Sequence, residues 1–264
     1  MSLRRQVRFW RTPALPGLEL RRARYARQTF ARHTHPVWSL GLVLEGQTHF
    51  ELGEACWQAG AGDLVLIPPQ AVHDCNPQGE APLGYWMFYL DPVWLPGLTA
   101  RSPCQVVWSQ PEAFAALRAL ATRLPGLLQR GESLDEWRQG WLAQMAEVLA
   151  CWPAQSPSAD RTPSPWLARA QALLCQPQEL SLTHLSQALG LSPSYLNRRF
   201  GAELGLPPHR YQLQQRIELA KTALRAGAPI VQVAVELGFS DQSHFTRHFT
   251  AIVGATPAQY QKGL

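Results

Sequence analysis

The sequence predicts an α+β protein of two domains: an N-terminal β-barrel that ends in helices, and an all-helical C-terminal domain with two helix-turn-helix units. Three observations predict this class. Short apolar runs bounded by Gly and Pro fill residues 36–110, helix-forming segments begin at residue 111, and one helical pattern occurs twice after residue 166. A chain of 264 residues is long enough to bury two hydrophobic cores.

The strands of the predicted barrel, residues 1–110, are short. We expect them at residues 38–45, 48–52, 63–67 and 83–90, where apolar or aromatic runs stop close to Gly or Pro. Several short strands in succession favour a sandwich or a small barrel over alternating strands and helices.

Two helices are expected in residues 111–152, at 112–124 and 132–152. Apolar side chains of the second helix recur at helical spacing and form one stripe: Leu134, Trp137, Trp141, Met145, Val148 and Trp152. Such a stripe needs a partner surface. It either packs on the barrel of its own chain or forms the seam of a homodimer, so this segment is a candidate dimer interface.

Residues 153–165 are rich in Pro and Ser and are interpreted as a linker between the domains. The charge balance changes beside this linker. Residues 1–160 contain fourteen Lys or Arg and fourteen Asp or Glu, whereas residues 161–264 contain ten and five. The net charge of +5 therefore belongs to the C-terminal part, which suits a polyanionic partner such as nucleic acid.

Other features of the composition exclude several classes. The five cysteines are scattered and form no CxxC motif or Cys/His cluster, so neither a disulfide framework nor a structural zinc site is indicated. No apolar run approaches the roughly 20 residues of a membrane span. The Arg-containing N-terminus lacks the apolar core of a secretion signal. We expect a cytoplasmic protein without a membrane partner.

The C-terminal domain, residues 166–264, contains an internal repeat with an offset of 49 residues. Gly190 and Gly238 suit the turn of each copy. Ser192 can cap the second helix of the first copy, and Ser240 or Asp241 that of the second copy. Six positions match, five of them by identity: Leu196, Arg198, Phe200, Gly205, Pro208 and Tyr211 correspond to Phe245, Arg247, Phe249, Gly254, Pro257 and Tyr260.

The second helix of each copy is predicted to have two distinct faces. Leu196 and Phe200, like their counterparts in the second copy, are spaced to face the core. Residues 208–226 are predicted to form one helix that sets the spacing of the two recognition helices, which suits a major-groove repeat of about 34 Å. Polar residues that can pair with base edges lie on the outer faces: Ser194, Asn197, Arg198, Gln242, Ser243, Thr246 and Arg247.

This region resembles the signature of the AraC/XylS family of transcription regulators. The resemblance covers residues 166–264 and is carried by residues 231–250, Gly254-Ala-Thr-Pro257 and Tyr260, with residues 185–211 matching the other half of the signature. It implies a bacterial activator that works as a homodimer with RNA polymerase and places its two recognition helices in adjacent major grooves of double-stranded DNA.

The resemblance also implies which residues contact DNA. Gly201 is a departure, because the family commonly has Lys there, so the resemblance does not carry a phosphate contact over to this position. Base contacts are expected from Ser194, Asn197, Arg198, Gln242, Ser243, His244, Thr246 and Arg247.

Residues 25–92 resemble the small cupin barrel of the arabinose-sensing members of that family. By this resemblance the barrel is a sensor that binds a small organic effector, and Trp86 matches an aromatic residue that stacks on the sugar. The matching pieces are His33-Thr-His35, Glu45-Gly46, residues 62–69, His73 and residues 85–92. Ligand contacts are expected from His33, His35, His73 and Trp86.

The three histidines leave several interpretations open. In a strand His33 and His35 would point the same way, and two or three histidines can bind zinc or iron. The carboxylate that metal cupins place after His35 is missing, since residues 38–40 are Trp-Ser-Leu. The histidines can hold a metal, contact an organic ligand or serve the core. We predict an organic ligand and no cofactor.

No nucleophile–base pair, phosphate loop or paired carboxylates are visible, so the chain is not expected to be an enzyme. One alternative is a metal-dependent cupin enzyme with an appended binding module, which bound metal and turnover would favour. Another is a ligand-independent DNA-binding protein whose barrel serves only dimerisation, which a fully packed interior would favour. The arginines ahead of the sensor motif are interpreted as a solvated face or arm: Arg21, Arg22, Arg24 and Arg27.

Overall fold

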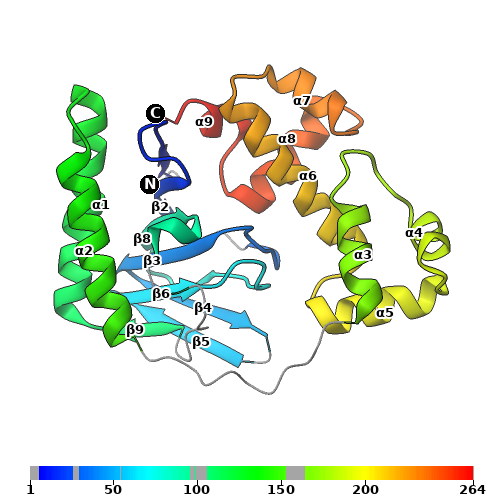
Figure 1. The fold of residues 1–264 in the computed structure, drawn as a ribbon, viewed down its shortest axis with the longest axis horizontal. Coiled ribbons are helices and arrows are strands. Elements are labelled where there is room, and N and C mark those ends of the chain that lie inside the picture. The colour runs from blue at the N-terminus through cyan, green and yellow to red at the C-terminus, as the bar shows by residue number, and fades with distance from the viewer. Residues whose placement is uncertain are drawn as a thin grey trace. The chain divides into compact units, whose positions relative to one another are not determined.

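The computed structural model describes residues 6–25, 30–53, 55–95, 98, 106–152 and 164–263. Its chain divides into two compact units (Figure 1). A β-rich unit contains residues 1–29 and 35–159 together with 263–264, and a helical unit contains residues 30–34 and 160–262. Most of the predicted linker, residues 153–165, lies outside the described residues.

Two antiparallel sheets form the β-rich unit. The larger sheet has six strands in the order β1 (Gln6–Trp10), β2 (Leu18–Tyr25), β8 (Leu83–Leu90), β3 (Trp38–Glu45), β6 (Asp63–Ile67) and β9 (Val107–Ser109). The smaller sheet has the order β5 (Ala55–Gly60), β4 (Gln47–Leu52) and β7 (Asn76–Gln78). The strands predicted at 38–45, 63–67 and 83–90 are confirmed to the residue, and β4 begins one residue early.

The arginine-rich segment is strand β2, and its interpretation as a solvated face or arm was wrong. β2 pairs with β1 on one side and β8 on the other, so its side chains meet the core. Arg21 is only 4% exposed. The guanidinium of Arg22 lies 5.5 Å from the ring centroid of Trp86, and Arg24 forms an ion pair with Glu45. Arg27 lies outside the described residues.

Helices α1 (Pro111–Arg130) and α2 (Asp135–Cys151) lie side by side against the larger sheet (Figure 1). The predicted end of α1 at residue 124 is wrong, because the helix continues through Pro125 to Gly131, which ends it with φ 65°. Burial of Leu124 and Leu127 in the core compensates for the backbone hydrogen bond that proline cannot donate. A short 3-10 helix, Pro92–Trp94, follows β8.

The stripe of α2 packs on the sheet of its own unit. Trp137, Trp141 and Met145 are fully buried, and they belong to the same core cluster as Leu40 of β3 and Phe88 of β8. The ring centroids of Phe88 and Trp141 are 4.4 Å apart. The apolar stripe of α2 therefore forms part of the core of this unit.

The helical unit contains α3 (Pro165–Leu174), α4 (Leu182–Leu189), α5 (Pro193–Leu204), α6 (Pro208–Arg225), α7 (Ile230–Glu236), α8 (Gln242–Val253) and α9 (Pro257–Gln261). The two predicted helix-turn-helix units are confirmed as α4–α5 and α7–α8, separated by α6. Phe200 lies in a core shared by α3, α4, α5 and α6. In the second copy Phe249 contacts both Phe245 and Tyr260, at centroid distances of 5.5 and 5.6 Å. No helix among the described residues is long and apolar enough to cross a bilayer.

Candidate nucleic-acid interface and sensor site

Both recognition helices begin at a side-chain cap. Ser192 accepts a hydrogen bond from the backbone N–H of Tyr195 at 3.3 Å, and Asp241 accepts one from that of His244 at 2.7 Å. Asp241, rather than Ser240, is therefore the cap of α8. The backbone hydrogen bond from His244 is the main cause that lowers the pKa of Asp241. Its carboxylate stays charged at the positive end of the helix dipole.

The two faces of each recognition helix separate as expected. Leu196 and Phe200 of α5 and Phe245 and Phe249 of α8 are fully buried. Six of the predicted base contacts are exposed: Ser194, Asn197, Arg198, Gln242, Ser243 and Arg247. His244 and Thr246 are half-buried. Each copy of the repeat thus presents a polar outer face that its own core does not use.

His244 differs from the other predicted base contacts, because both of its ring nitrogens interact within the protein. Its Nδ1 lies 3.1 Å from the hydroxyl of Ser240, and its Nε2 lies 2.9 Å from Nε2 of His248. Burial first, then the charges of His244 and three arginines, lower the pKa of His248. His244 can therefore form a hydrogen bond with a base only if its interaction with Ser240 or with His248 breaks.

Arg216 of α6, which the sequence analysis missed, connects the segment before α4 to the turn of the second copy. Its Nε donates to the backbone carbonyl of Leu237 at 2.7 Å, and its Nη1 pairs with Glu179 at 3.3 Å. The guanidinium lies 4.2 Å from the ring centroid of Phe239, in the turn of the second copy. The sequence did contain a signal for the burial of Arg216, because this arginine is next to Ile217 on the buried side of the predicted helix.

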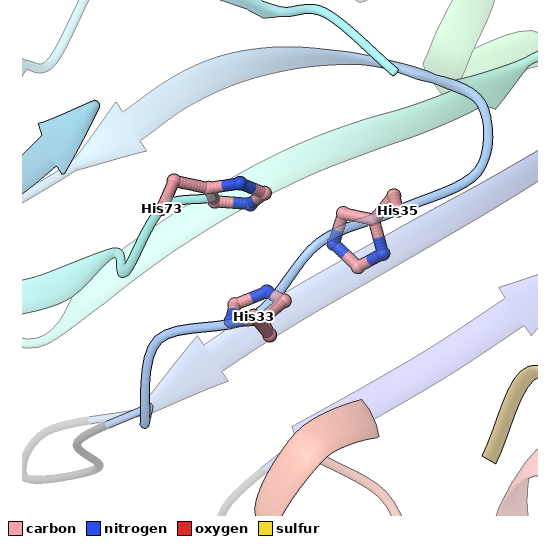
Figure 2. Close-up of side chains that lie close together, drawn as sticks. All are labelled: His33, His35 and His73. Atoms are coloured by element: carbon pink, nitrogen blue, oxygen red, sulfur yellow. The ribbon is translucent and has the colours of Figure 1, made fainter. Parts of the chain in front are cut away.

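Two of the predicted sensor histidines, His35 and His73, lie together in the β-rich unit (Figure 2), whereas His33 belongs to the short segment 30–34 that groups with the helical unit. His33 and His35 lie in the loop before β3, and His73 lies in the loop after β6. His33 and His73 are 6% and 3% exposed. The ring of His35 lies 5.2 Å from that of His73 and 4.9 Å from that of Tyr89.

Trp86 does not join the histidines. Side chains alternate along β8, so Trp86 and Tyr89 face opposite sides of the sheet. Tyr89 contacts His35. Trp86 instead packs on Trp10, with 5.4 Å between the ring centroids, and belongs to the core covered by α1 and α2. The four residues predicted to contact a ligand therefore do not line one site.

Arg21 is a second feature of the β-rich unit that sequence reasoning missed. Its Nη1 donates to the hydroxyl of Tyr89 at 3.3 Å, and its guanidinium lies 5.6 Å from the ring centroids of Phe9 and Tyr85. The hydroxyls of Tyr85 and Tyr25 lie 3.2 Å apart. Polar aromatic groups thus surround a buried cation close to His35.

Two family models match separate parts of the chain. The model of an AraC-like ligand-binding domain matches residues 15–133, and that of a helix-turn-helix domain matches residues 185–263. The chain belongs to the AraC family of transcriptional regulators. The two matches fall on the β-rich unit and on the helical unit.

Curated relatives of this AraC-family chain cover it to different extents. It is 36% identical over 97 residues to the regulatory protein Ada of Salmonella typhimurium, a match that spans 37% of the chain and 28% of Ada. The chain spans 34% of the probable transcriptional regulator LumQ of Photobacterium leiognathi. It is 25% identical over 241 residues to the HTH-type regulator YbfI of Bacillus subtilis, covering 86% of the chain and 85% of YbfI.

Solved structures of ToxT from Vibrio cholerae have the same two-part fold as this AraC-family chain. One aligns with a TM-score of 0.56 and covers 97% of this chain and 96% of ToxT, at 11% sequence identity. At this identity the likeness shows the fold alone. Another structure of ToxT contains a bound unsaturated fatty acid.

Proposed function

We propose that this protein is a sequence-specific DNA-binding activator of transcription, controlled by a small organic effector that binds in the β-rich unit. One observation carries the proposal. A capped helix with a buried apolar face and an exposed polar face occurs twice, as α5 and α8, within one unit. That unit contains the excess of basic over acidic residues, which favours binding to a polyanion.

In the proposed complex α5 and α8 enter successive major grooves on one side of the duplex, about 34 Å apart. Arg198 and Arg247 occupy the same position in the two copies and are exposed. Arginine commonly pairs with the acceptor edge of guanine. The other proposed base contacts are Ser194, Asn197, Gln242, Ser243, His244 and Thr246.

Two observations support an effector in the β-rich unit. The family model of an AraC-like ligand-binding domain covers residues 15–133, and the structurally similar ToxT binds an unsaturated fatty acid. Our proposal includes a homodimer and a contact with RNA polymerase. Because the α2 stripe is buried, we place the dimer contact on the outward faces of α1 and α2.

Capture of genomic fragments by the full chain, followed by sequencing, tests the proposal. The captured fragments are expected to share a site, and the chain should bind that duplex more tightly than a scrambled one across a salt series. Equal affinity for both duplexes would refute sequence-specific reading. In transcription with purified RNA polymerase, the chain and its effector should raise the transcript from a captured promoter, and a lower transcript would refute activation.

A further inference from the structure

We propose that His244 and His248 chelate one divalent transition-metal ion on the recognition helix α8, with copper(II) as the preferred ion. The two residues are four positions apart in one helix, so their side chains lie on the same face, one turn apart. The Nε2 atoms of the two rings are 2.9 Å apart, and the ring centroids are 4.6 Å apart. Both side chains are half-buried. Two imidazole nitrogens thus lie side by side at the surface of the helical unit.

The distance between the two nitrogens matches one coordination geometry. With metal–nitrogen bonds of about 2.0–2.1 Å, two ligands at a right angle lie about 2.9 Å apart, whereas two ligands of a tetrahedral ion lie about 3.3 Å apart. The observed 2.9 Å fits the right angle. Square-planar or tetragonal sites with nitrogen and oxygen ligands are typical of copper(II) and nickel(II), and copper(II) binds most tightly of the divalent first-row ions. The pair occupies two adjacent positions of the ion and leaves the others to water.

A chain of hydrogen bonds prepares His244 as a ligand. The hydroxyl of Ser240 donates to Oδ2 of Asp241 at 3.3 Å, so its oxygen accepts from Nδ1 of His244 at 3.1 Å. Nδ1 therefore carries the proton of the neutral ring, and Nε2 carries the lone pair. Histidines that bind metals usually donate their other N–H in this way, which fixes the tautomer and the ring orientation. Without an ion, Nε2 of His248 donates to this lone pair. With an ion, His248 holds its proton on Nδ1 instead.

The surroundings of the pair limit ring motion and set the expected affinity. The ring centroid of Phe239 lies 5.7 Å from that of His244 and 6.2 Å from that of His248. This contact restricts both imidazoles, so little conformational entropy is lost when the ion binds. The charges of three arginines, among them Arg247, act on His248 and oppose a further cation. We therefore expect micromolar rather than nanomolar binding.

Copper(II) titration of the full chain, after removal of metals with a chelator and dialysis, tests the site directly. We expect His244→Gln and His248→Gln each to weaken one equivalent of copper binding at least tenfold, because a chelate needs both rings. Electron paramagnetic resonance of that equivalent should show two nitrogen ligands in the wild type and fewer in either variant. His184→Gln is the matched control, because His184 is exposed on α4 of the same unit.

A second control addresses the other close pair of histidines, His35 and His73 of the β-rich unit. The double variant H35Q/H73Q should keep the equivalent that His248→Gln loses. If His248→Gln binds copper like the wild type, or if only H35Q/H73Q loses the equivalent, the proposal is wrong. Circular dichroism checks folding. If one single variant unfolds, the other variant and the resonance spectrum of the wild type decide.

A bound ion should also take His244 away from DNA, a consequence that rests on the proposed function. With Nδ1 held by Ser240 and Nε2 held by the ion, neither ring nitrogen of His244 is left for a base. Saturating copper should therefore reduce the discrimination between captured and scrambled duplexes severalfold in the wild type and leave that of His248→Gln unchanged. Unchanged discrimination in the copper-loaded wild type would refute a base contact by His244, whereas the metal site is decided by the titration alone.

Discussion

Burial separates arginines that look alike in the sequence. Arg198 and Arg247 project from the outer faces of their recognition helices. Arg216 and Arg21 are 5% and 4% exposed, and their guanidinium groups bind carbonyl, hydroxyl and aromatic partners inside the protein. Only an arginine on an exposed helix face, such as Arg198 or Arg247, can reach a DNA base. The functional assignment therefore depends on the direction of each side chain as well as on its type.

Replacement of Arg198 or Arg247 by Ala should weaken binding to the captured site more than binding to scrambled DNA. A bidentate arginine–guanine pair contributes about 1–3 kcal/mol of discrimination. A residue that only contacts phosphate would weaken both duplexes alike and lower the salt slope by about one. Titrations of each variant against both duplexes over a salt series measure the difference.

Arg123→Ala is the control for lost charge, because Arg123 is exposed in the β-rich unit and pairs with Glu136. It should leave the discrimination between duplexes unchanged. Equal losses on both duplexes for Arg198→Ala and Arg247→Ala would show that these arginines contact only the backbone of DNA.

Acidification should destabilise the helical unit through His248. The pKa of His248 is lowered from its ordinary value of 6.5, chiefly by burial. The unfolded chain therefore binds more protons below that value, and the free energy of unfolding falls as the pH drops from 6.5 to the lowered pKa. Urea unfolding followed by circular dichroism at about pH 7.5 and about pH 5.5 should show a smaller loss for His248→Gln than for wild type.

His184→Gln serves as the control, because His184 is exposed on α4 of the same unit. It should retain the pH dependence of the wild type. A His248→Gln protein with an unchanged pH dependence would mean that other groups cause the loss of stability.

At the scale of elements, tertiary packing decided how α1 and α2 are used. The sequence pattern of α2 allowed either a dimer seam or a cover for the sheet. In the structure Trp141 is fully buried, lies 5.6 Å from Trp137 between ring centroids, and donates from Nε1 to the carbonyl of Trp94 at 3.1 Å. The same packing carries α1 past Pro125, where local preference alone would end the helix.

Trp141→Ala should destabilise the β-rich unit by about 3–5 kcal/mol, because it removes a large buried ring and leaves a cavity. Gln139→Ala, at an exposed position of the same helix, should change the stability by less than about 0.5 kcal/mol. Urea unfolding followed by tryptophan fluorescence measures both. If Trp141→Ala instead left stability intact and only dissociated a dimer in sedimentation, the stripe would be a subunit interface.

At the scale of the whole molecule, the net charge changes at the same place in the chain where one hydrophobic core ends and the next begins. The helical unit has its own hydrophobic core around Phe200 and a second aromatic cluster around Phe249. Its net positive charge contrasts with the neutral balance of residues 1–160. Independent cores allow each unit to fold and act by itself.

A fragment of residues 160–264 should fold and bind DNA, with an affinity that falls steeply as salt increases. The reason is that both recognition helices, their caps and Arg216 belong to this part of the chain. A fragment of residues 1–159 is the control and should not bind. Fluorescence anisotropy with labelled duplexes at several salt concentrations measures both, and a folded 160–264 fragment that bound no DNA would contradict the assignment.

The helix-turn-helix pair could be read from the sequence because its signals are local. Gly190 and Gly238 adopt φ of 67° and 69°, and caps and core residues lie within one or two turns of each other. Such features depend on hydrogen bonds and steric limits between near neighbours, which the order of residues determines. Strands with clear apolar runs, such as β3 and β8, were predictable for the same reason.

The sensor site depended on contacts between distant parts of the chain. His35 meets His73 only because the loops before β3 and after β6 converge. The face on which Trp86 lies follows from the register of β8, since a shift of one residue reverses every side chain. Burial of Arg21 requires neighbours on both sides of β2. Local sequence determined the two helix-turn-helix units, and long-range packing decided which polar side chains gather inside the β-rich unit.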